Sequence, residues 1–206
     1  MGSPKENILR KIRKGKERAN LWNQVSEPSI DNFFTSSEQD LVNTFKTAIE
    51  KIDGKFLIAN TDVELENIVK DVLIDTNVVC FDKELQQILE QNQISFSEKL
   101  DKESNPTGFI ACEYLVARLG SVLTSSALKS GRELNIFPEH QVVFAKKEQL
   151  IYDIKDAIEG IKLKYETLPS MISFATGPSR TADIEKTLIL GAHGPKRLTI
   201  IYQNFD

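Results

Sequence analysis

The sequence has few of the residues on which redox and metal chemistry usually depend. Its 206 residues include two cysteines and two histidines. Cys80 and Cys112 stand far apart, so no C-x-x-C pair is available for zinc or an iron–sulfur cluster, and two thiols are too few for a disulfide scaffold. We therefore expect no cofactor in this chain and a reducing, cytoplasmic location.

Long apolar runs and phosphate-binding motifs are also missing. No stretch is long enough to cross a bilayer, which excludes a membrane span, and the basic N-terminus is not followed by the apolar segment of a secretory signal. Neither G-x-x-x-x-G-K-[ST] nor G-x-G-x-x-G occurs. What is present is ordinary for a globular protein, with 40% hydrophobic and 27% charged residues.

Charge is distributed unevenly along the chain. Residues 1–20 hold seven basic and two acidic side chains, a surplus of five, so the overall net charge of −4 leaves −9 on the remainder. A basic segment can indicate nucleic-acid binding, but no aromatic residues interleave these charges and the rest is acidic. We interpret the segment as a solvated helix face whose Ile8, Leu9 and Ile12 dock on the body or on another subunit. The oligomeric state, including a homo-oligomer, stays open.

Helical and strand patterns alternate in the first half of the chain. Ser36–Gln39 and Thr61–Glu64 are capping-box sequences, and apolar residues at helical spacing follow each of them. Gly54 is expected to end the first helix. Residues 55–60 and 77–81 are predicted strands, and a helix is predicted over 83–91.

The second half begins with an irregular segment. Residues 109–126 carry apolar residues without one clean period, which we interpret as a short helical turn followed by strand interrupted near Gly120. Further strands are predicted at 140–145, 171–175 and 198–202, and the strongest amphipathic pattern predicts a helix over Lys147–Tyr165. Together these patterns predict an α/β domain at 36–206 with a mainly parallel sheet, preceded by a helical arm at 1–35.

The segment from Thr176 to Pro195 has the most informative composition. A strand runs into the turn Gly177–Ser179, which places Ser179 or Thr181 as the cap of a helix. Backbone N–H groups at that helix start, with Arg180 beside them, suit a phosphate or carboxylate. Two acidic residues in the first turn of the same helix already complement its dipole, so physical chemistry alone leaves the anion site undecided.

The same segment carries a family resemblance. The string GPSRTADIEKTLILGAHGP closely resembles the C-terminal signature of the LUD-domain family of lactate-utilisation proteins. Ala117–Ser121 is similar to the family's Ala-Glu-[Ser/Thr]-Gly-Thr, with Arg118 in place of the usual Glu. The stretch from Gly131 to His140 is similar to the family's G-R-x-L…P-x-x-H, and Glu6–Lys14 resembles its N-terminal helix.

The resemblance implies a three-layer α/β fold like those of ribose-phosphate isomerase, CoA transferases and formyltetrahydrofolate cyclo-ligase. It implies a role in oxidising L-lactate to pyruvate beside two partner proteins, one of which carries iron–sulfur clusters. Because this chain has no cluster-binding cysteines, any redox centre would belong to those partners. The candidate anion-binding residues are expected to converge on one cleft at strand ends; they are Gly120, Ser121, Ser125, Arg132, Gly177, Ser179, Arg180 and His193.

Two of these positions have competing interpretations. His193, with Asp183 and Glu185, forms a weak metal-ligand set, and a bond from its imidazole to a backbone carbonyl that fixes the glycine-rich loop is the favoured interpretation. Arg118 cannot act as the nucleophile or base that a Glu supplies, so we expect no Glu-dependent covalent chemistry and readier anion binding. Its alternative role is to face solvent or pair with Glu113.

Three functions remain open on sequence grounds. The first is a non-redox component of L-lactate utilisation that binds a small carboxylate or a phosphorylated anion. The second is a stand-alone enzyme of the isomerase or acyl-transferase type that uses the same cleft. The third is a non-catalytic assembly factor for partner proteins.

Overall fold

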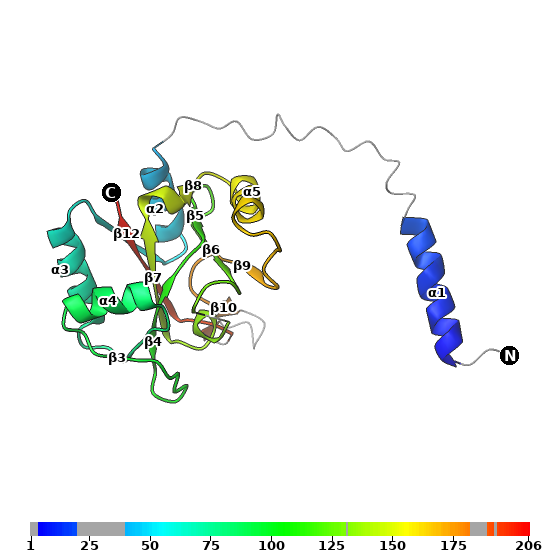
Figure 1. Ribbon diagram of the computed structural model, residues 1–206, viewed down its shortest axis with the longest axis horizontal. Helices are drawn as coiled ribbons and strands as arrows, with labels where there is room; N and C mark the ends of the chain where they lie inside the picture. Colours follow the sequence, from blue (N-terminus) through cyan, green and yellow to red (C-terminus); the bar gives the residue numbers. More distant parts are fainter. Residues whose placement is uncertain (1–3, 20–39, 131, 182–188, 192) are drawn as a thin grey trace. The chain divides into compact units, whose positions relative to one another are not determined.

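The computed structural model describes residues 4–19, 40–130, 132–181, 189–191 and 193–206 (Figure 1). The chain divides into two compact units, residues 1–38 and residues 39–206. The domain boundary expected after residue 35 lies outside the described residues and stays a prediction. No helix among the described residues is long and apolar enough to span a membrane.

The first unit contains helix α1, Pro4–Ala19. Its apolar side chains Ile8, Leu9 and Ile12 are 41–59% exposed. Their predicted docking on the body or on another subunit stays a prediction. The rest of the description concerns residues 39–206.

A six-stranded sheet forms the centre of the second unit. Its strands, in spatial order, are β1 (Lys55–Ala59), β12 (Arg197–Gln203), β7 (His140–Lys146), β4 (Thr107–Ala111), β2 (Val78–Val79) and β3 (Phe96–Ser97). Every neighbouring pair among them is parallel. Their amino ends therefore share one edge of the sheet and their carboxyl ends the other, which sets where loops and ligands meet.

The helices around this sheet begin at side-chain caps. The caps of α2 (Leu41–Glu50), α3 (Asp62–Leu73) and α4 (Lys83–Gln91) are Asp40, Thr61 and Asp82. The helix over 83–91 and the cap at Thr61 agree with the sequence prediction. The predicted cap at Ser36–Gln39 lies outside the described residues, and the observed cap one residue later is Asp40, whose carboxylate accepts from two backbone N–H groups.

The end of α2 also differs in detail from the prediction. Gly54 was expected to end the helix, but Asp53 is the residue in the left-handed region, with φ 61°. The Gly54 N–H closes the turn on Ile49 O at 3.0 Å, and a Cβ on Gly54 would lie 2.6 Å from the Ile49 side chain. Gly54 is thus required for space and not for its φ angle.

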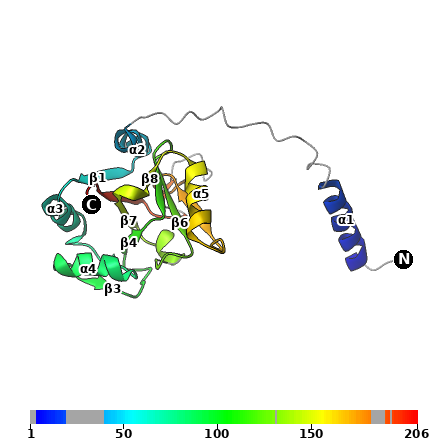
Figure 2. The same cartoon turned by 45° about the horizontal axis from the view of Figure 1, so that its top comes forward.

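Each face of the large sheet is covered. Helices α3 and α4 pack on one face, where Val69, Leu73 and Leu89 are fully buried. Helix α2 and a second sheet pack on the other, around Phe45 and Ile49. Both views place α3 and α4 together on the side opposite α5 (Figures 1 and 2). The predicted α/β class with a mainly parallel sheet is confirmed.

The second sheet corrects the interpretation of residues 109–126. Its strands, in spatial order, are β8 (Leu150–Ile151), β5 (Tyr114–Val116), β6 (Ser121–Ser125) and β9 (Ile172–Ala175). The expected helical turn at the start of 109–126 is wrong, because Phe109–Ala111 belongs to β4 in the middle of the large sheet. Burial on both faces removes the alternation that would have marked β4 as a strand.

The predicted helix over Lys147–Tyr165 is correct only in its second part. A short 3-10 turn (Lys147–Gln149) and β8 come first, and helix α5 spans Ile154–Lys164. Asp153 caps α5 in a capping box with Asp156. Leu150 and Ile151 fit the helical period, but they form a strand because they pair with β5.

The segment that resembles the family signature continues from its turn as a short strand. Arg180–Thr181 forms β10, paired antiparallel with β11 (Ile189–Leu190). Ser179 is therefore not a helix cap, since strand residues follow it, and the alternative cap at Thr181 stays a prediction. The helix predicted beyond it falls on residues 182–188, outside the described part of the chain.

Candidate functional site

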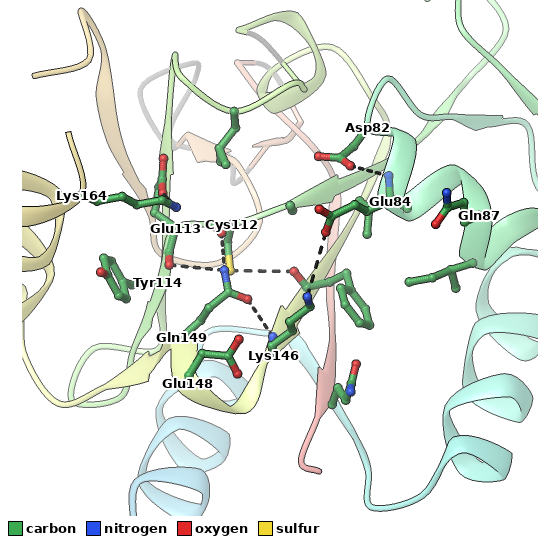
Figure 3. Close-up of a pocket in the computed structure, with 16 residues that line it drawn as sticks. Asp82, Glu84, Gln87, Cys112, Glu113, Tyr114, Lys146, Glu148, Gln149 and Lys164 are labelled. Carbon is green, nitrogen blue, oxygen red and sulfur yellow. Dashed lines mark hydrogen bonds and ion pairs between the residues drawn. The ribbon is translucent and has the colours of Figure 1, made fainter. Parts of the chain in front are cut away.

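A crevice of about 950 Å³ lies at the carboxyl edge of the large sheet. Its floor is formed where β4, β7 and β12 end, at Ala111, Lys146 and Gln203. Helix α4 forms one wall, and the loop after β4 with the end of α5 forms another (Figure 3). In parallel α/β sheets this edge is where ligands usually bind, so the crevice is the primary candidate site.

A buried carboxylate organises one wall of the crevice. Glu113 follows β4, and its side chain is completely buried. Its carboxylate accepts hydrogen bonds from the Ser125 hydroxyl at 2.5 Å, the Tyr165 hydroxyl at 2.8 Å and the Lys164 ammonium at 2.7 Å. Three donors satisfy a charge that would otherwise be costly to bury.

The network fixes the protonation of its members. Burial alone would lower the pKa of Lys164, but its hydrogen bond to Glu113 and the Glu113 charge outweigh burial, and the pKa lies above its ordinary value. Burial, followed by the hydrogen bond to Glu113, raises the pKa of the Tyr165 hydroxyl. At neutral pH the wall therefore presents an ammonium and a neutral phenol held by one carboxylate.

Gln149 joins two strand ends of the crevice floor by hydrogen bonds (Figure 3). Its amide donates to the carbonyl oxygen of Cys112 at 2.5 Å and accepts from the Lys146 N–H at 2.7 Å. The thiol of Cys112 is buried, and burial followed by the charge of Glu113 raises its pKa well above the usual range. Cys112 is consequently protonated and is not a nucleophile.

The charge of the lining limits what the crevice can bind. Its carboxylates are Asp82, Glu84, Glu113 and Glu148, and its cations are Lys146 and Lys164. The balance is −2, and each lysine already has a carboxylate near it, at 2.7 Å for Lys164 and 4.0 Å for Lys146. The crevice offers acid–base groups and hydrogen bonds, but its charge does not favour an anion.

Most of the predicted anion-site residues gather at the opposite edge, near the turn that leads from α2 into β1. Ideal Cβ atoms on Gly120 and Gly177 would lie 2.5 Å from Ile49 N and 2.9 Å from Ile52 O. Ser121 and Thr176, next to these glycines, share a hydrogen bond of 2.7 Å between their hydroxyls.

Two further predicted residues join this group through the loop after β9. The Arg180 guanidinium donates to Ile52 O and pairs with Asp53. The Ser179 N–H donates to Pro195 O at 2.8 Å, and Gly194 lies against the Ser179 side chain. His193, beside Gly194, is exposed.

Ser125 and Arg132 do not join this group. Ser125 lies at the far end of β6 from Ser121 and binds Glu113 in the crevice wall. Four strand steps of about 3.4 Å separate the two serines. Arg132 donates to the Ser170 hydroxyl at 2.7 Å, before β9. The structure thus brings together one group of the predicted residues and leaves these two at the other end of the small sheet.

The metal interpretation of His193 stays undecided. Asp183 and Glu185, its proposed companions, lie outside the described residues. Among the residues that are described, no group of three metal-ligating side chains occurs.

Arg118 pairs with a residue that the sequence did not indicate. Its guanidinium donates two hydrogen bonds to Asp153, at 2.9 Å from Nε and 2.8 Å from a terminal nitrogen. The expected alternative, pairing with Glu113, is wrong, because Glu113 points into the crevice wall. Arg118 instead links the β5–β6 turn to the first turn of α5.

Replacing Arg118 should weaken the protein more at neutral than at acidic pH. The hydrogen bond from Arg118 lowers the pKa of Asp153, so this pair stabilises the fold above the ordinary carboxyl pKa and is lost as pH falls through the lowered value. Arg118→Ala should cost about 1–3 kcal/mol at pH 7 and much less near pH 3, measured by urea unfolding. Arg118→Lys is the control, since it keeps the charge without the two-pronged contact. Equal losses at both pH values would contradict this account.

The residues that sequence reasoning missed are Glu113, Lys164 and Tyr165. Glu113 comes two residues after the end of a buried strand, a position typical of site residues in parallel sheets, and that was the available signal. Lys164 and Tyr165 are more than fifty positions away in sequence, and only folding brings them to it.

A comparison with known protein families gives a match over most of the chain. The model of the LUD domain matches residues 42–202, which include the group around Arg180 and every residue that lines the crevice except Gln203. This chain belongs to the LUD-domain family. The family resemblance of the C-terminal segment is thereby confirmed over most of the chain.

Relatives and a solved structure support the assignment. The chain is 26% identical to Lactate utilization protein C of Halalkalibacterium halodurans, over 95% of this chain and 94% of that protein. It is 27% identical to Lactate utilization protein C of Oceanobacillus iheyensis, over 82% and 72%. The crystal structure of a DUF162 family protein from Deinococcus radiodurans matches with a TM-score of 0.60 at 15% identity, covering 82% of this chain and 99% of that one. This last likeness concerns the fold alone.

Proposed function

We propose that this LUD-domain protein is a non-redox component of a system that oxidises L-lactate to pyruvate. The observation that carries the proposal is its similarity, over nearly its whole length, to a relative named Lactate utilization protein C. Within that system it binds a small carboxylate or phosphorylated anion at strand-end loops. The loops around Gly120, Gly177 and Arg180 are the proposed location.

The cysteines support a non-redox role. Cys80 and Cys112 are both buried and free, and two cysteines cannot supply the four ligands of an iron–sulfur cluster. Burial, the largest of several causes, raises the pKa of the Cys80 thiol to about 11. This thiol is therefore also unreactive. Electron transfer is therefore assigned to iron–sulfur partner proteins, and free thiols suit a cytoplasmic location.

Deleting the gene for this chain in its own organism should abolish or strongly slow growth on L-lactate, while growth on pyruvate stays normal. A copy encoding the wild-type chain should restore growth. The purified chain alone should not oxidise lactate with an artificial electron acceptor. Undiminished growth of the deletion strain on L-lactate would refute the proposal.

A second candidate function is a stand-alone acyl-transfer or isomerase activity in the crevice. The specific observation in its favour is the Glu113 carboxylate, held beside Lys164 and Tyr165 at the edge where such sites occur. Transfer of coenzyme A from acetyl-CoA to a short carboxylate, which releases acetate, would establish it if the transfer is lost in a folded Glu113→Gln variant and hydroxylamine converts an enzyme thioester at Glu113 to a hydroxamate. Absence of transfer in the folded wild type leaves the lactate role or an assembly role.

A further inference from the structure

A small pocket of about 140 Å³ opens at the amino edge of the large sheet, opposite the crevice. Its floor is made by the first residues of three neighbouring parallel strands, Lys55 of β1, Arg197 of β12 and His140 of β7. Arg197 and His140 are register partners, so their backbones lie side by side. The loop carrying Pro178 and Arg180 lines another side.

The pocket is strongly basic. Its charged lining residues are Lys55, Arg180, Lys196 and Arg197 against Asp53. Asp53 is committed to Arg180, and Lys196 lies 3.8 Å from Glu139. Lys55 and Arg197 have no ion-pair partner among the described residues, so two positive charges without a counter-ion line one small pocket.

His140 adds a buried, unsatisfied polar atom to this pocket. The residue is only 7% exposed, and its Nε2 lies 2.9 Å from the Thr199 hydroxyl. Its Nδ1 is buried without a hydrogen-bond partner among the described residues. An unpaired buried nitrogen is unfavourable, and such an atom in a native protein calls for a ligand or a water.

The protonation of His140 reflects its burial and the positive charge around it. Burial, then the charges of Arg197 and Lys55, lower the pKa of His140 to about 4. When Thr199 donates to Nε2, the neutral ring carries its proton on Nδ1 and is a hydrogen-bond donor. An anion between Lys55 and Arg197 would offset their charges and accept from that nitrogen.

We infer that this pocket binds a small oxyanion, a carboxylate or a phosphate group, between Lys55, His140 and Arg197. Its volume is well below the 300–1,000 Å³ usual for larger organic ligands, so it accepts a compact anion or the anionic head of a larger molecule. The planar guanidinium of Arg197 suits two-pronged binding of either group. This inference gives the anion binding of the proposed function a location. The choice of a carboxylate as ligand rests on that proposed function.

Calorimetric titration of the full chain at low ionic strength tests the site with three probes: L-lactate, pyruvate and inorganic phosphate. At least one should bind saturably to wild type, about tenfold or more weakly to Arg197→Ala, and with partial recovery in Arg197→Lys. Lys99→Ala is the matched control, because it removes an equal charge beside β3, at the opposite side of the sheet from β1. It should bind as wild type does.

A second readout reports directly on the pocket. The imidazole signals of His140 in NMR spectra should titrate at higher pH in the presence of the bound anion than in its absence. Binding of lactate or pyruvate supports the carboxylate, and binding of phosphate alone supports the phosphate group. No saturable binding of any probe, or binding that Arg197→Ala leaves unchanged in a folded protein, overturns the inference. Lactate growth of the deletion strain is a separate result, so the two proposals fail independently.

Discussion

Replacing Glu113 with alanine should lower the melting temperature of this protein by about 6–20 °C. Its carboxylate is completely buried and accepts from Ser125, Lys164 and Tyr165. The Lys164 side chain is 47% exposed and can return to water, but an unpaired, buried Ser125 hydroxyl and the cavity left by the carboxylate together cost about 3–5 kcal/mol. A domain of this size loses about 2–4 °C per kcal/mol. Thermal unfolding followed by circular dichroism and urea unfolding measure the loss.

The matched control is Glu98→Ala. Glu98 also pairs with a lysine, Lys83, and accepts from the amide of Gln86, but its side chain is 56% exposed. Its hydrogen bond to Lys83 lowers its pKa, yet water competes with both partners, so the loss should be much smaller than that of Glu113→Ala. If Glu113→Ala costs no more than Glu98→Ala, the buried network does not stabilise the crevice wall.

Gly120→Ala should destabilise the protein by about 3 kcal/mol. Gly120 has φ 62°, which costs an L-residue about 1–2 kcal/mol. In addition, its Cβ would lie 2.5 Å from the backbone nitrogen of Ile49 and 2.8 Å from the carbonyl carbon of Ala48, and helix backbone cannot move aside. Such overpacking typically adds about 1–3 kcal/mol. Urea unfolding at neutral pH gives the value.

Gly191→Ala separates backbone strain from crowding. Gly191 has a similar φ of 77°, but the atoms that its Cβ would meet belong to the flexible side chain of Lys196. It should therefore lose only about 1–2 kcal/mol from strain. Equal losses in the two variants would show that contact with α2 contributes nothing, and that the small sheet is not tightly seated on that helix.

Several elements followed directly from local sequence. The helix over 83–91 was predictable because its caps and its apolar face lie within eleven residues, Asp82–Asn92. The strands of His140–Lys146 and Arg197–Gln203 were predictable from runs of buried apolar residues. The LUD family was evident from the ordered string of glycines, Ser179 and His193, now confirmed over residues 42–202.

Other features depended on contacts between distant parts of the chain, which no local pattern reveals. Leu150 and Ile151 fit a helical period as well as a strand, and pairing with Leu115 and Val116 decided between them. The local sequence does not show which carboxylate pairs with Arg118. Its partner is Asp153 because β5 and β8 are paired, which brings the two residues together across 35 positions.

The sequence by itself therefore determined the α/β class, the family and the residue types available for binding, because each depends on local order along the chain. Only the tertiary structure decided which of those residues share a site. Parallel pairing sends the amino ends of β1, β7 and β12 to one edge, where Lys55, His140 and Arg197 meet, and sends their carboxyl ends to the other, where the crevice lies. Ser125 binds Glu113 far from Ser121 because a strand is extended, and an extended chain keeps its two ends apart.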